Sequence, residues 1–170
     1  TGMGASIGMA LVPALIWLFY IYRQDRLEPE PPTLVLSTFI LGGILAWSIA
    51  SPAIEYVFQI SDWRYGSTES KWIAAVAIVG GAQQFCAYLA VRFCVFHSNE
   101  LDEPMEGIVY ATAAGLGIAT ATSLKLITAN EGMMPMAGSA LIAGTTLIHV
   151  AAALPLGIGI SRTRFGVPSL

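Results

Sequence analysis

Hydrophobic positions along the chain fall into five long apolar stretches that short polar loops separate. The stretches lie near residues 4–22, 33–59, 71–96, 105–128 and 137–160. Each reaches the roughly 20 residues that a helix needs to cross the hydrocarbon layer of a membrane. The pattern predicts an all-α fold, a polytopic transmembrane helix bundle of about five spans, as a single domain over residues 1–170. Pro52 is expected to kink or end the second span.

The stretch of residues 101–119 combines an acidic loop with a helix rich in small residues. Four acids lie between Glu100 and Glu106, directly before the fourth apolar run, which places a membrane boundary there. Small side chains then recur every four residues, at Ala111, Gly115, Ala119 and Ser123. They share one helix face, so a neighbouring backbone is expected to pack closely against it.

Composition narrows the class of protein and its partners. With 55% hydrophobic and 11% charged residues, the chain lies outside the range of soluble domains, in which about a quarter of residues are charged. The net charge of −3 comes with no basic stripe, which excludes a nucleic-acid binder. Membrane lipids and other membrane protein subunits are the expected partners. Cys86 and Cys94, roughly 12 Å apart on one predicted helix, are expected to be free thiols.

The distribution of positive charge predicts an orientation. Alternating the five spans puts five Arg residues on one side and three Lys or Arg residues on the other: Arg23, Arg26, Arg92, Arg162 and Arg164 against Arg64, Lys71 and Lys125. Positive loops stay in the cytoplasm, so the N-terminus is expected outside and the C-terminus in the cytoplasm. The first apolar stretch precedes its positive charges, which favours a retained span over a signal peptide.

Few polar side chains lie at membrane depth, which makes each a candidate for function. They are Gln83 and Gln84 in the third span, Thr122 and Ser123 in the fourth, and His149 in the fifth. If these three spans pack together, the polar groups would converge on one interior site. The alternative is a structural role, in which these side chains form hydrogen bonds between helices and take part in no reaction.

These residue types are poorly suited to catalysis or to metal binding. One imidazole among neutral amides and hydroxyls makes a poor zinc or iron site, so no metal and no cofactor is expected. His149 remains a candidate single axial ligand for a pigment, whereas His97 follows the third span near the membrane surface and is badly placed for a second haem ligand.

Four features of the sequence are specific when taken together: YRQDRLEPEP at 22–31, QQFCAY at 83–88, LDEPMEGIVYA at 101–111 continuing into GLGIA at 115–119, and His149. In order and spacing they resemble the PrsW family of intramembrane metalloproteases. The resemblance covers most of the chain, and its two loop motifs are the specific part. It implies a helical membrane protein of the bacterial inner membrane, related to the CAAX prenyl protease and abortive-infection group, that cuts membrane-bound substrates such as anti-sigma factors.

The resemblance also implies where catalytic residues would lie, and this chain departs from the family there. The family's Glu-Glu pair falls on Gln83 and Gln84, the Lys one turn later falls on Ala87, and the Glu-Asn pair falls on Thr122 and Ser123. An amide cannot accept a proton as a general base, and a metal loses its neutralising charge when carboxylates are replaced. Changes at all these positions fit natural degeneration better than an engineered pair at 83 and 84.

His149 is the one family position that is retained, while the Arg expected before it has no counterpart between Gly138 and Leu147. We therefore predict a pseudoprotease, without catalytic residues, that serves as a binding or structural subunit of a membrane complex. The first alternative is an active PrsW-like metalloprotease that binds zinc and uses a set such as Glu103, Glu106 and His149. The second is a pigment- or lipid-binding accessory subunit.

Overall fold

The computed structural model describes residues 3–23, 30–98, 100–129 and 135–166. All regular structure in these ranges is helical. Four helical stretches are long and apolar enough to cross a membrane, and a shorter apolar helix precedes them: Pro32–Val57, Thr68–Cys94, Pro104–Ala129 and Gly138–Phe165, with Ile7–Tyr22 before them. The predicted polytopic all-α bundle is confirmed, and its boundaries agree with the hydropathy pattern to within about five residues.

Two of the spans are built from several helical segments. The elements in chain order are α1 (Met3–Tyr22), α2 (Pro32–Leu45), η1 (Ala46–Ala50), η2 (Ala53–Val57), η3 (Ile60–Tyr65), α3 (Thr68–Ile73), η4 (Ala74–Gly80), α4 (Gly81–Cys94), α5 (Pro104–Ala129) and α6 (Pro135–Phe165). The segments η1, η2 and η4 are π-helical. Two of them flank Pro52, so the second span continues past this proline instead of ending there. It ends at Val57, and two residues later Gln59 has a left-handed φ of 48°.

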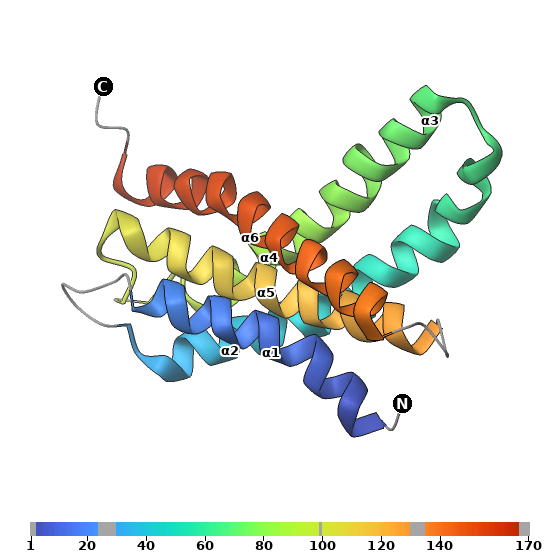
Figure 1. Cartoon of the computed structure of the whole chain (residues 1–170). Helices are drawn as coiled ribbons and strands as arrows, with labels where there is room; N and C mark the ends of the chain where they lie inside the picture. The colour runs from blue at the N-terminus through green and yellow to red at the C-terminus, as the bar shows by residue number, and fades with distance from the viewer. Residues whose placement is uncertain (1–2, 24–29, 99, 130–134, 167–170) are drawn as a thin grey trace.

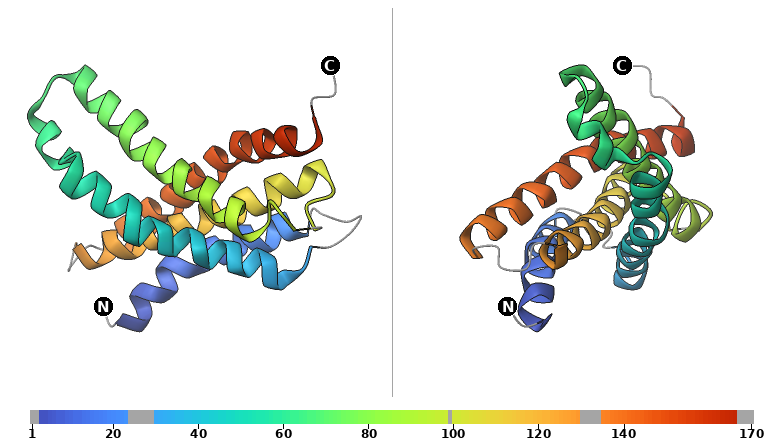
Figure 2. Two further views of the ribbon diagram at one scale, coloured as in Figure 1. Left: turned by 180° about the vertical axis from the view of Figure 1, so that it is seen from behind. Right: turned by 90° about the vertical axis from the view of Figure 1, so that its right-hand side faces the viewer.

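Helix α5 is the centre of the bundle. Figures 1 and 2 show α1, α2 and α6 lying along it, and α4 also packs against it. In its most apolar window, 78% of the residues are buried inside the protein, against 22–33% for the other three spans. The neighbouring helices therefore cover α5, whose small side chains were predicted to allow close packing.

Glycines let the backbones of α2 and α6 approach α5 on two faces. A Cβ built on Gly115 would lie 3.1 Å from the carbonyl oxygen of His149 in α6. On the other face, a Cβ on Gly117 would collide with the carbonyl oxygen of Phe39 in α2 and lie 3.0 Å from the amide nitrogen of Gly43. In lipid, such close backbone contact stabilises helix pairs through van der Waals packing.

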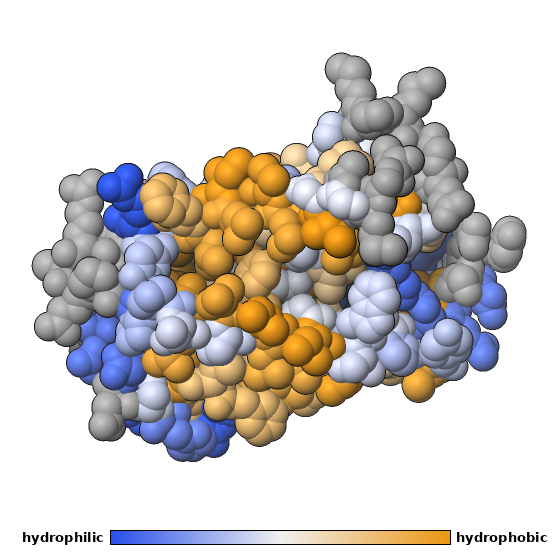
Figure 3. Space-filling model, turned by 90° about the horizontal axis from the view of Figure 1, so that it is seen from below, coloured by the Kyte–Doolittle hydropathy of each residue, from blue (hydrophilic) through white to orange (hydrophobic). Residues whose placement is uncertain are grey.

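The hairpin of residues 46–80 leaves the bundle at an angle, as Figures 1 and 2 both show. Its large apolar side chains are exposed, including Tyr56 (76%), Trp72 (67%) and Val76 (66%). The face in Figure 3 carries a continuous apolar band between two hydrophilic ends. This distribution is the one that a bilayer requires, with apolar side chains toward the acyl chains and polar groups at both interfaces.

Candidate functional site

The third and fourth spans bring two of the predicted site residues into contact. Gln83 on α4 donates a hydrogen bond from Nε2 to Oγ1 of Thr122 on α5, at 3.5 Å. Ala87, one turn further along α4, is 1% exposed. The two spans that carry Gln83 and Thr122 therefore pack together, as predicted, and the side chains in contact are an amide and a hydroxyl.

His149 presents one ring nitrogen to the interior of the bundle. Its side chain is 6% exposed, and Nδ1 lies 2.7 Å from the carbonyl oxygen of Thr145, one turn earlier on α6. A carbonyl only accepts, so Nδ1 carries the proton and Nε2 keeps its lone pair. Nε2 is buried and has no hydrogen-bond partner in the described part of the chain. The structure thus places an imidazole inside the membrane region whose Nε2 has no partner among the described residues.

Further polar atoms near the centre of the bundle are also buried without a partner among the described residues. They are Oε1 of Gln84 on α4, and Oγ1 of Thr112 and Oγ of Ser123 on α5. Thr112 and Ser123 are 11 residues apart, three helical turns, and so share one face of α5. Buried polar groups normally have a protein or water partner. With His149 on α6, the helices α4, α5 and α6 therefore each carry a buried polar atom whose hydrogen-bonding capacity is not satisfied by the described residues.

The donor set does not fit the metal that the resemblance implies. No group of three or more His, Cys, Asp or Glu side chains lies close enough to hold a metal ion in the described ranges. Apart from His149, the side chains at the family positions are amides, hydroxyls and a methyl group, which bind zinc weakly compared with carboxylate, imidazole and thiolate. These side chains therefore do not make up a zinc site in the described part of the chain.

A second buried polar cluster lies at the other end of α5, and the sequence did not predict it. Glu30 and Glu106 are both 3% exposed, and the hydroxyl of Tyr110 donates to the Glu30 carboxylate. Glu106 accepts from the backbone N–H groups of Asp102 (2.7 Å) and Glu103 (3.0 Å). The second bond is half of a capping box around Pro104, the first residue of α5. The spacing Glu-Pro-X-Glu was the available signal, and it indicates a helix cap.

This arrangement separates Glu103 and Glu106 from His149. The backbone of His149 lies beside Gly115, and Glu106 is nine residues earlier on α5, about 13 Å along the helix axis. The Glu106 carboxylate is turned back toward the first turn of α5. The set Glu103, Glu106 and His149 is therefore not assembled, although Glu106 does fold inward as that alternative required.

Other predicted features can be placed directly. Cys86 and Cys94 are free thiols, as expected, and Cys86 Sγ lies 3.6 Å from the carbonyl oxygen of Leu45. Glu55 is exposed and forms an ion pair with Lys125. His97 is exposed in the turn after α4. Residues 24–29, inside the motif at 22–31, lie outside the described part of the chain.

The fold and the site define an integral membrane protein in which three spans present buried polar groups to the bundle interior. The chain belongs to the PrsW family: the family described as PrsW family intramembrane metalloprotease matches residues 30–167. This match confirms the family resemblance, and its range contains the motifs at 83–88 and 101–119 and His149. Membership of the family does not by itself show whether this chain is catalytic.

Bacterial relatives agree with the family assignment. A protein named Protease PrsW from Geobacillus kaustophilus is 27% identical over 165 residues, 97% of this chain and 69% of the relative. Proteins of the same name from Oceanobacillus iheyensis and Bacillus subtilis are 30% and 29% identical, over 75% and 69% of this chain and 56% and 51% of the relatives. The chain thus spans about half to seven tenths of these relatives. No solved structure matches the chain.

Proposed function

We propose that this chain is a PrsW-family membrane protein that binds other membrane components without cleaving them. The observation that carries the proposal is the contact of Gln83 with Thr122 at positions where the family resemblance implies carboxylates. An amide and a hydroxyl do not take up a proton from water near neutral pH, so this pair cannot activate a nucleophilic water. His149 supplies one acceptor atom, and within the described ranges no group of three metal-binding side chains includes it.

The exposed hairpin of residues 46–80 supports a binding or structural role. Its large apolar side chains Tyr56, Trp72 and Val76 are exposed, and π-helical segments interrupt both arms. In a membrane these side chains face lipid or the helices of another subunit. The predicted location is the inner membrane of a bacterium, with the N-terminus outside and the C-terminus in the cytoplasm. Labelling of single Cys residues placed in the 61–66 loop and after Phe165 tests this orientation.

A cleavage assay tests the proposal most directly. The purified chain in nanodiscs is incubated with a fluorescent transmembrane peptide, and its metal content is measured in parallel. We expect no turnover above a protein-free control and no stoichiometric zinc. The matched variant restores the family residues by Gln83→Glu, Gln84→Glu, Ala87→Lys, Thr122→Glu and Ser123→Asn. Stoichiometric zinc with turnover by the unaltered chain refutes the proposal, whereas gain of zinc by the restored variant alone supports it.

The second candidate is an active intramembrane protease, and the family relationship favours it more directly than it favours a pseudoprotease. The family is described as a metalloprotease family and the relatives are named proteases. Under this hypothesis the free Nε2 of His149 is essential, and His149→Ala abolishes turnover while Thr145→Ala, which leaves the carbonyl partner in place, does not. Turnover that survives His149→Ala excludes the imidazole from such a reaction.

A further inference from the structure

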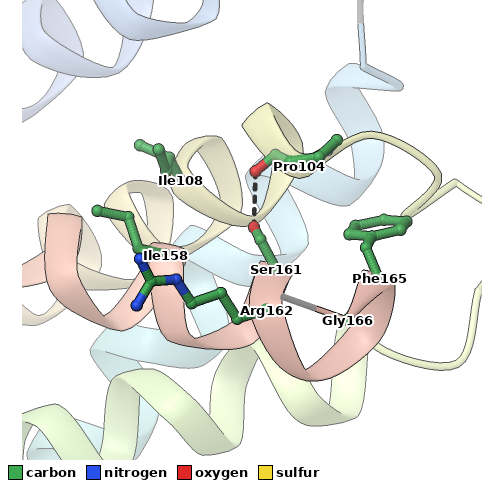
Figure 4. Close-up of a pocket in the computed structure, with 7 residues that line it drawn as sticks. All are labelled: Pro104, Ile108, Ile158, Ser161, Arg162, Phe165 and Gly166. Carbon is green, nitrogen blue, oxygen red and sulfur yellow. Dashed lines mark hydrogen bonds between the residues drawn. The ribbon is translucent and has the colours of Figure 1, made fainter. Parts of the chain in front are cut away.

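A pocket of about 330 Å³ opens on the outer surface where α5 begins and α6 ends. It is lined by Pro104, Ile108, Ile158, Ser161, Arg162, Phe165 and Gly166. Figure 4 shows the aliphatic side chains of Ile108 and Ile158 on one side and the ring of Phe165 on the other. The wall is fixed in place because Ser161 Oγ donates to the carbonyl oxygen of Pro104 at 2.6 Å, which ties α6 to the start of α5.

Arg162 brings a positive charge to this apolar pocket. Its guanidinium runs back along the helix toward Ile158, as the close-up shows, instead of extending past the helix end. Within the described residues, Arg162 forms no hydrogen bond and no ion pair. Asp102 and Glu103 lie in the preceding loop, yet neither makes an ion pair with it. Arg164, two residues on, instead lies 3.5 Å from the carbonyl oxygen of Ser98.

The pocket lies at the level of the membrane interface. Pro104 is the first residue of one candidate span, and Phe165 is the last residue of another. The lining side chains Ile158 (42% exposed) and Phe165 (40%) face outward, toward lipid in a membrane. A ligand here would have acyl chain beside the isoleucines and a polar head beside the guanidinium. Arg binds phosphate through a planar fork of N–H donors, which suits this position.

We propose that this pocket binds one anionic phospholipid from the leaflet on the side of the chain's C-terminus. Its phosphate pairs with Arg162, and the first part of one acyl chain lies between Ile108 and Ile158. The charge complementarity argues for this occupant over a neutral lipid, because Arg162 has no described carboxylate to neutralise it. The proposal is independent of whether the protein cleaves peptides, since the pocket is remote from Gln83, Thr122 and His149.

Native mass spectrometry of the purified full chain tests the proposal, with phosphatidylglycerol and phosphatidylcholine added in equal amounts. We expect preferential retention of phosphatidylglycerol. Arg162→Gln should weaken it about fivefold, as estimated for loss of one basic residue near an anionic lipid surface. Arg164→Gln is the matched control and should change retention little. Arg162→Lys keeps the charge and should retain most of the preference, and Ile108→Trp should block the pocket with the charge intact.

The outcomes distinguish a phospholipid site from a site for any small anion. Equal retention of the two lipids, or equal loss in Arg162→Gln and Arg164→Gln, overturns the proposal. The proposal is also overturned if millimolar inorganic phosphate displaces phosphatidylglycerol and the acyl chain contributes nothing to retention. The pocket would then be a simple anion site. Circular dichroism of each variant confirms the helical fold, and loss of preference in a folded Arg162→Gln variant supports the proposal.

Discussion

The contact between α2 and α5 at Gly117 gives the sharpest prediction on stability. Gly117→Ala places a Cβ against the backbone of Phe39 and within 3.0 Å of the Gly43 nitrogen. These are main-chain atoms, so no side chain can rotate away and the two helices must separate. Overpacking of a well-packed interior costs about 1–3 kcal/mol, and backbone collision argues for the upper end. Alanine also recovers about 1 kcal/mol of helix propensity. The expected net loss is therefore about 1–2 kcal/mol.

Gly144→Ala is the matched control because it gains the same propensity without the collision. Gly144 is also inside a long helix, and a Cβ there meets nothing within 4 Å. Both variants gain the same helix propensity, so it cancels when their unfolding free energies are subtracted. The remaining difference, about 2–3 kcal/mol, is the cost of the collision at Gly117. Unfolding by SDS in mixed micelles, followed by circular dichroism, measures it. Equal stability of the two variants would refute the close packing of α5 on α2.

Three further substitutions test the polar contacts. Tyr110→Phe removes the donor to the buried Glu30 carboxylate and should cost about 1–3 kcal/mol in the same unfolding assay; an unchanged midpoint would show that the bond is not formed. Glu106→Ala removes the acceptor at the start of α5 and should cost about 0.5–2 kcal/mol, with Glu106→Gln recovering part of it. Lys125→Met breaks the half-exposed ion pair with Glu55 and should change stability by less than about 1 kcal/mol.

An absorption spectrum addresses the remaining alternative for His149. If its free Nε2 ligates a pigment, the protein purified from native membranes absorbs in the visible range, and His149→Ala loses that band. Without a pigment, both proteins absorb only in the ultraviolet. The measurement is independent of the cleavage assay, because the one reports a bound chromophore and the other reports hydrolysis of a peptide.

Much of the architecture was predictable because it depends on local properties of the chain. The apolar stretches gave the number and approximate limits of the spans, since the thickness of the hydrocarbon layer sets a minimum helix length. The small residues at Ala111, Gly115 and Ala119 predicted close packing of the fourth span, and Gly115 does contact the backbone of His149. The loop motifs were sufficient to indicate the family to which the chain belongs.

The candidate site was only partly predictable, because tertiary contacts determine which polar side chains become hydrogen-bond partners. Glu30 is 80 residues from Tyr110, so no periodicity links them, and only tertiary packing brings this buried carboxylate to the Tyr110 hydroxyl. Residue type alone allows Glu106 and His149 to be grouped in one site, yet the backbone of His149 lies beside Gly115, about 13 Å along the axis of α5 from Glu106.

The sequence by itself determined that this is a polytopic membrane protein of the PrsW family, and the resemblance aligns the family's expected carboxylates with Gln83, Gln84 and Thr122. Those conclusions follow from hydropathy, motif spacing and residue identity, which are properties of the unfolded chain. The tertiary structure decided which polar atoms meet. It brings Gln83 to Thr122, leaves Nε2 of His149 without a partner among the described residues, and places Arg162 at an apolar pocket. The physical reason is that hydrogen bonds and charge pairs act over a few ångströms, and only packing brings distant segments that close.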